Sequence, residues 1–224
     1  MEPLVSPYCT VSTPSHRGVT LIELIVVMGI IAVLSTVVVV SQTNFNKTML
    51  LSNAAYDVAL AIRSAETYGL GSRTTGTIKQ NSGYGVHFEP GTKSFIIFAD
   101  NDSPADGCHK VPATGPSAPN ATPGNCVYVA ASDVLVQTLT LGNNTTIADA
   151  CVLSNSGWTC APTLTKLDMV FARPNTETYL SKNGVYAADN TKAYVKLTSP
   201  QGGASYVCIY KTGVISVLTS SDSC

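Results

Sequence analysis

The apolar residues near the start of this 224-residue chain follow two different patterns. Residues 19–40 form an apolar run that is interrupted by a few small residues and by one carboxylate, Glu23. Residues 51–69 instead carry an apolar or small residue at every third or fourth position, which is the spacing of one helix face. That stripe consists of Leu51, Ala55, Val58, Ile62, Ala65 and Gly69.

One continuous helix is predicted across both patterns. No proline interrupts residues 19–70, and Gly69 and Gly71 supply a stop signal. Such a helix has about 50 residues and is roughly 75 Å long. Its polar positions 53, 57, 64 and 67 lie away from the apolar stripe.

From residue 72 the pattern changes to short apolar runs that are separated by turn residues. One hairpin is predicted to join residues 84–88 to 94–98, and a second to join residues 206–210 to 214–218. Further strands are predicted at residues 134–141, 145–153, 166–172 and 193–198. Residues 103–125, rich in Pro, Gly, Ala and Asn, predict a long loop.

The apolar run at residues 19–40 is long enough to cross a bilayer, since 22 helical residues span roughly 33 Å. A secretory signal peptide has a shorter apolar region and a basic start. Here the preceding 18 residues carry only Glu2 and Arg17 as charges. A simple anchor would leave Glu23 unexplained, because a carboxylate in a spanning helix costs a few kcal/mol and usually has a partner or a role.

Glu23 has a local explanation as well. Thr20-x-x-Glu23 is a capping-box pattern, and the helix dipole favours a carboxylate in the first turn. This explains why Glu23 is tolerated near a membrane edge. It does not explain Gly18, which directly precedes the apolar run.

The stretch Gly18-Val19-Thr20-Leu21-Ile22-Glu23 resembles the processing motif of type IV prepilins and pseudopilins, the class III signal sequence. The resemblance implies that a prepilin peptidase cuts between Gly18 and Val19 and then N-methylates Val19. It implies that Glu23 meets the N-terminal ammonium of a neighbouring subunit, an ion pair that offsets much of the desolvation cost. Two departures are Val19 in place of the commoner Phe and a leader that is longer and less basic than many.

The resemblance implies an α+β pilin fold, in which a long N-terminal helix, half of it transmembrane, packs on an antiparallel β-sheet head. The implied parts are a leader (1–18), a transmembrane and assembly helix (19–40), an amphipathic half (41–71) and a disulfide-stapled head (72–224). Three segments, residues 54–69, 84–102 and 207–217, resemble the GspH/FimT family of minor pseudopilins and minor pilins. The resemblance covers residues 18–110 and roughly 200–218.

Six of the seven cysteines follow the apolar run, which favours disulfides in an oxidising compartment. No C-x-x-C pair occurs, and only His109 lies close by, so a metal site is disfavoured. Six cysteines allow fifteen pairings. The near-neighbour pairs are Cys108 with Cys126, Cys151 with Cys160, and Cys208 with Cys224.

Other chemistry is sparse. The three histidines, His16, His87 and His109, are scattered, and no nucleophile elbow, phosphate loop or H-E-x-x-H pattern occurs, so we expect no enzyme. We expect no cofactor. A calcium site on Asp100, Asp102 and Asp106 is the candidate, but the spacing departs from the EF-hand, and a solvated Asp/Asn-rich turn is favoured.

Three functions remain open at this stage. The first is a minor pilin or pseudopilin that initiates or caps a type IV pilus or a type II secretion pseudopilus. Its partners would be the prepilin peptidase, other pilins in a hetero-oligomeric filament and the inner-membrane assembly platform, with a single-pass anchor and an extracytoplasmic head.

The alternatives are a pilus-associated receptor for DNA uptake and a membrane-anchored surface domain outside any filament. A nucleic-acid partner is disfavoured, because the net charge is −1 and the second half of the chain has few Lys or Arg.

Overall fold

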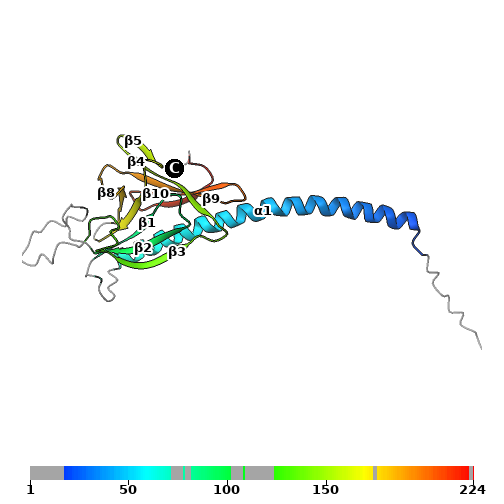
Figure 1. Ribbon diagram of the computed structural model, residues 1–224, viewed down its shortest axis with the longest axis horizontal. Helices are drawn as coiled ribbons and strands as arrows, with labels where there is room; N and C mark the ends of the chain where they lie inside the picture. The colour runs from blue at the N-terminus through cyan, green and yellow to red at the C-terminus, as the bar shows by residue number, and fades with distance from the viewer. Residues whose placement is uncertain are drawn as a thin grey trace, which may run out of the picture. The chain divides into compact units, whose positions relative to one another are not determined.

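The computed structural model describes residues 18–71, 78, 82–101, 108, 124–173, 176–221 and 224, without the side chains of residues 40–47. The chain divides into an N-terminal unit, Met1–Asn44, and a larger unit, Phe45–Cys224, which is called the head below. Each unit is described by itself. One helix and eleven strands lie in the described residues, and together they form an α+β architecture consistent with the pilin fold (Figure 1).

Helix α1 spans Leu21–Leu70 without a break, as the absence of proline predicts. At its end the backbone N–H of Gly71 donates to the carbonyl of Thr67 at 2.9 Å. The predicted helix is therefore confirmed. It begins two residues after the predicted start and ends at the predicted residue.

The head contains two antiparallel sheets. Sheet A has six strands in the order β3-β2-β1-β6-β7-β8. Its strands are β1 Gly83–Phe88, β2 Ser94–Asp100, β3 Val134–Thr140, β6 Leu167–Phe171, β7 Thr178–Lys182 and β8 Val185–Tyr186. Sheet B has five strands in the order β11-β10-β9-β4-β5. Its strands are β4 Thr146–Ser154, β5 Gly157–Cys160, β9 Lys192–Thr198, β10 Ala204–Tyr210 and β11 Ile215–Leu218.

The helix stripe and the inner faces of both sheets form one hydrophobic core. Val58, Ile62 and Ala65 of α1 are fully buried in it, against residues such as Met169 of sheet A and Val195 of sheet B. In Figure 1 the strands gather around this cyan part of the helix. The predicted apolar stripe is therefore the face of α1 that the head buries.

The helix lies close to sheet A at Gly69. A Cβ atom at this position would lie 2.2 Å from the backbone carbonyl oxygen of Phe171. Such a distance is far inside van der Waals contact, so only glycine allows the helix to pass β6 at this depth.

Both predicted hairpins are present as β1–β2 and β10–β11. The other four predicted strands are also present, as β3, β4, β6 and β9. Strands β5, β7 and β8 are not anticipated by the sequence pattern. Of the predicted loop at residues 103–125, only Cys108, Gly124 and Asn125 lie among the described residues.

A β-bulge in β4 sets the face of several side chains. The register with β9 shifts between Ile147 and Asp149, so Ala148 is the extra residue. Ile147 and Ala150 both face the core, while Asp149 and Cys151 face outward. Without the bulge, strict alternation would send Asp149 into the core.

Candidate functional site

The segment that carries the processing motif forms the cap and the first turn of α1. The hydroxyl oxygen of Thr20 accepts a hydrogen bond from the backbone N–H of Glu23 at 3.3 Å. The carbonyl of Thr20 accepts from the N–H of Leu24 at 3.1 Å. Thr20 is therefore the N-cap, and Glu23 lies in the first turn, where the helix dipole favours its charge.

Gly18 and Val19 lie exposed ahead of the cap. No heavy atom lies within 4 Å of the position that a Cβ on Gly18 would occupy. The described fold therefore has room for a side chain at residue 18. A requirement for glycine here would have to come from an outside protein that binds this peptide.

The first part of α1 presents apolar side chains on all sides. Residues Leu21–Val39 have a mean hydropathy of 2.7 and are long and apolar enough to cross a membrane, and the span has no buried residue. The hydroxyl of Thr36 donates to the carbonyls of Ala32 and Val33 at 3.0 and 2.7 Å, so this polar group is satisfied within the helix. The segment thus depends on surroundings outside its own unit to cover its apolar surface.

Gly29 leaves a shallow notch in this apolar surface. The notch has a volume of about 310 Å³ and is lined by Val26, Ile30, Val33 and Leu34 around the glycine. No heavy atom lies within 4 Å of a Cβ built on Gly29. A small residue at such a place lets a second helix approach closely.

The structure pairs the six cysteines as the three near-neighbour disulfides. The Cα–Cα distances are 5.8 Å for Cys108–Cys126, 4.1 Å for Cys151–Cys160 and 5.9 Å for Cys208–Cys224. The second pair joins opposite residues of β4 and β5. The third ties the end of the described chain to β10.

The calcium candidate is only partly described. Asp102 and Asp106 lie outside the described residues. Asp100 is fully buried, and its two carboxylate oxygens accept the backbone N–H groups of Asn125 and Cys126 at 3.0 and 2.7 Å. These bonds give Asp100 a structural role beside the Cys108–Cys126 disulfide.

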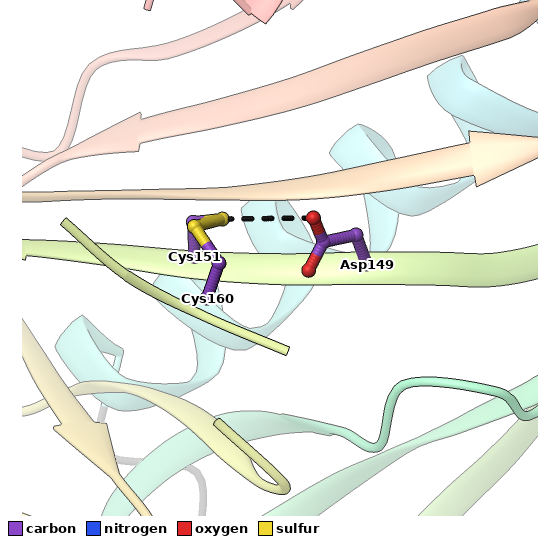
Figure 2. A group of neighbouring side chains, drawn as sticks. All are labelled: Asp149, Cys151 and Cys160. Atoms are coloured by element: carbon purple, nitrogen blue, oxygen red, sulfur yellow. Dashed lines mark hydrogen bonds between the residues drawn. A yellow bond between two sulfur atoms is a disulfide. The ribbon is translucent and has the colours of Figure 1, made fainter. Parts of the chain in front are cut away.

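A second cluster of metal-ligand types lies on β4 and β5, and the sequence pattern does not predict it. Asp149, Cys151 and Cys160 each place an oxygen or sulfur within 4.8 Å of the others (Figure 2). Both sulfurs are joined in a disulfide, and a metal needs the free thiolate. Asp149 Oδ1 instead accepts the N–H of Ala161 at 3.1 Å. The residues as bonded here do not form a metal site.

A buried ion pair in sheet A joins His87 and Asp168. His87 Nδ1 lies 2.6 Å from Asp168 Oδ1 on neighbouring strands, and His87 Nε2 lies 3.3 Å from Glu89 Oε1. Tyr128 covers the pair with its ring centroid 4.9 Å from the imidazole. Both ring nitrogens face carboxylates, so neither is left to take a proton from a substrate.

The pKa values of both partners are shifted upward. Burial opposes protonation of His87 and is the largest influence, but hydrogen bonds and charge from Asp168 and Glu89 together outweigh it and raise the pKa of His87. Burial raises the pKa of Asp168 by more than its hydrogen bond with His87 lowers it. The sequence places His87 on a strand but contains no local sign of a partner 81 residues away.

Comparison with known protein families identifies the N-terminal segment. Residues 13–39 match the family model of the prokaryotic N-terminal methylation motif. The match supports a type IV pilin-like prepilin signal, and it implies processing by a prepilin peptidase and assembly with other pilins. Comparisons with curated proteins and with solved structures gave no significant match. Together with the apolar helix, the motif points to a membrane-anchored, single-pass protein.

Proposed function

We propose that this chain is a minor pilin or pseudopilin of the GspH/FimT type. It is cleaved between Gly18 and Val19, N-methylated at Val19 and incorporated into a type IV pilus or a type II secretion pseudopilus, where it initiates or caps the filament. The partners in this proposal are the prepilin peptidase, other pilins and the inner-membrane assembly platform. The head lies on the extracytoplasmic side.

One observation carries the proposal. The methylation motif at residues 13–39 coincides with the capped start of a helix whose apolar side chains are all exposed over Leu21–Val39. A membrane covers such a surface before assembly, and neighbouring helices cover it in a filament. The notch at Gly29 supports the second environment, because it allows close helix packing.

The role of Glu23 follows from the cleavage. Within the described residues, Glu23 makes no ion pair and lies exposed in the first turn of α1. Cleavage after Gly18 creates an ammonium group on Val19. In a filament, Glu23 of one subunit pairs with that ammonium of a neighbour, and the low dielectric penalises any subunit that is out of register.

Processing is tested by mass spectrometry of the N-terminal peptide from the native cell. We expect a peptide that begins at Val19 and carries one methyl group on its amine. The same protein from a strain without prepilin peptidase should retain its leader. Gly18→Val should also retain it, although the described fold has room for the side chain. An intact leader in the native cell would refute the proposal.

The assembly role is tested with Glu23→Ala and with Glu23→Asp, which keeps the charge on a shorter side chain. We expect Glu23→Ala to insert in the membrane, to be cleaved and to keep a folded head. Its incorporation into filaments should fall by about tenfold or more, since an unpaired buried charge is strongly penalised. Incorporation of Glu23→Asp should lie between that of Glu23→Ala and that of the wild type. Normal incorporation of Glu23→Ala would leave Glu23 with a capping role alone.

A further inference from the structure

The outer face of sheet B carries several aromatic and cationic side chains. Tyr194 and Lys196 of β9 lie opposite Cys208 and Tyr206 of β10, and all of them point away from the core. The ring centroid of Tyr194 lies 5.3 Å from that of Trp158 on β5 and 5.7 Å from that of Tyr206. A continuous row of rings therefore crosses the sheet from its β5 edge.

A groove of about 430 Å³ opens beside this row of rings. It is lined by Leu153, Trp158, Cys160, Lys192, Tyr194, Ser221 and Cys224. Its volume falls in the range of pockets that hold a small molecule. Trp158 remains 44% exposed, although a large indole gains from burial against a partner.

The walls of the groove are fixed in place. The Cys151–Cys160 disulfide fastens β5 to β4, and the Cys208–Cys224 disulfide fastens the end of the described chain to β10. The carbonyl of Cys224 also accepts hydrogen bonds from Lys192 Nζ at 2.7 Å and from the hydroxyl of Tyr210 at 3.4 Å. A groove with preorganised walls loses little conformational freedom when it binds a ligand.

The cations of this face are already engaged. Lys192 Nζ lies 5.0 Å from the ring centroid of Tyr210 as well as bonding to Cys224, and Lys196 Nζ lies 5.9 Å from that of Tyr206. Asp149 stands opposite Lys196 on β4. A phosphodiester chain would have to compete for these ammonium groups, so the charge pattern favours an uncharged ligand over a nucleic acid.

The remaining chemistry is that of a ligand with one apolar face and many hydroxyls. Trp158, Leu153 and Tyr194 offer an apolar wall, and the Ser221 hydroxyl and the Tyr194 phenol offer hydrogen bonds at its rim. Burial raises the pKa of Tyr194, and Asp149 and Tyr206 add to the rise, so the phenol keeps its proton as a donor. We propose that this groove is a binding site for a neutral oligosaccharide, with one sugar ring stacked on Trp158.

This site is independent of the proposed assembly function, because it uses the head and not the N-terminal segment. Sequence analysis did not anticipate it. Its residues come from β4, β5, β9 and the end of the described chain, and β5 was not predicted as a strand.

The test uses the full chain in a zwitterionic detergent, because glucoside and maltoside detergents carry sugar groups themselves. Trp158 is the only tryptophan, so its fluorescence reports on the groove alone. We expect cellotriose, maltotriose, mannotriose or chitotriose to shift its emission with saturation at a Kd of about 1 mM or tighter. Oligodeoxythymidine is titrated in parallel at low and high salt.

Variants show which residues bind the sugar. Because Trp158→Ala has no tryptophan fluorescence, sugar binding by the variants is measured by saturation-transfer NMR on the sugar. Trp158→Ala should weaken it by about tenfold or more. Ser221→Ala, which removes one half-buried hydroxyl and leaves the strands unchanged, should weaken it by a few-fold. The matched control is Tyr56→Ala, an aromatic residue of α1 that is 56% exposed, and it should bind as wild type does.

Three outcomes would overturn the proposal. The first is no response to any of the four sugars at about 10 mM. The second is unchanged sugar binding by folded Trp158→Ala and Ser221→Ala proteins. The third is binding of the oligonucleotide alone with a steep salt dependence, which would assign the groove to nucleic acid.

Discussion

Helix α1 carries the same kinds of apolar residue in two different surroundings. In the N-terminal unit, Ile31 is 52% exposed, and every residue of Leu21–Val39 is exposed. In the head, Ile62 is fully buried within the core. The head therefore buries the apolar stripe of its own part of α1, whereas the N-terminal unit leaves its apolar side chains for a membrane or for neighbouring subunits.

Charge follows the same division. Asp168 of the head is fully buried and lies 2.6 Å from its partner His87. Glu23 of the N-terminal unit is exposed and has no ion pair among the described residues. Under the proposed function, the partner of Glu23 is the Val19 ammonium of a neighbouring subunit. Matched substitutions in the two units test this contrast.

The largest effect is expected from the isoleucine pair. Ile62→Ala removes fully buried methylene and methyl groups from the core and should lower the free energy of unfolding of the head by about 4 kcal/mol. Ile31→Ala should leave it unchanged, because no residue of Leu21–Val39 is buried in the structure. Urea unfolding followed by circular dichroism measures both. Equal losses in the free energy of unfolding from the two substitutions would contradict the division between a buried and an exposed part of α1.

The carboxylates give the next largest difference. Asp168→Ala leaves Nδ1 of the buried His87 without its partner, while Glu89 still faces Nε2, and should destabilise the head by about 3 kcal/mol. Glu23→Ala should leave head stability unchanged and act on filament incorporation alone. The two variants are compared by urea unfolding and by the amount of each protein in purified filaments. A stable head in Asp168→Ala would show that the ion pair adds nothing to the fold.

The sequence predicts the contrast between the exposed and the buried part of α1 well, because this contrast depends on local patterns of apolar residues. A 3.6-residue stripe at residues 51–69 identifies the buried face, and the continuous run at residues 19–40 identifies the exposed helix. The motif from Gly18 to Glu23 depends on neighbouring residues only. These features need no knowledge of which segments meet in the folded head.

Features made by distant residues could not be predicted in the same way. The bulge at Ala148 reverses the alternation of β4, and no residue there marks it. Strand β7, Thr178–Lys182, alternates weakly, and β5 has four residues. The His87–Asp168 pair and the groove beside Trp158 arise from strand order, which the pattern of a single strand does not contain.

A smaller effect is expected from the glycines. Gly69→Ala would place a Cβ 2.2 Å from the Phe171 carbonyl oxygen, so the helix must move away from β6. We expect a loss of about 2 kcal/mol in the free energy of unfolding. Gly29→Ala meets no atom within 4 Å and should leave head stability unchanged. An unchanged midpoint of urea unfolding for Gly69→Ala would show that the helix can move away from β6 without a loss in the free energy of unfolding.

The smallest effect is a dependence of head stability on pH. The folded state raises the pKa of His87 above 6.5 and that of Asp168 above 3.8, so at both groups it holds a proton more tightly than the unfolded chain does. The free energy of unfolding therefore falls as pH rises. The contribution of His87 is fully present below pH 6.5 and is lost as pH rises through its raised pKa. Asp168 contributes in the same sense, and its stabilisation is lost as pH rises from 3.8 through its own raised pKa.

Urea unfolding at a series of pH values from about 5.5 to 8.5 measures this slope. His87→Gln should flatten this slope, because it removes the group whose pKa the fold raises above 6.5. Glu23→Gln should retain the wild-type slope, because its carboxylate is not part of the head. If the free energy of unfolding of His87→Gln keeps the full slope against pH, a group other than His87 binds the proton. If Glu23→Gln changes the slope, a charge in the N-terminal unit affects the stability of the head. That result would contradict the division between the two units.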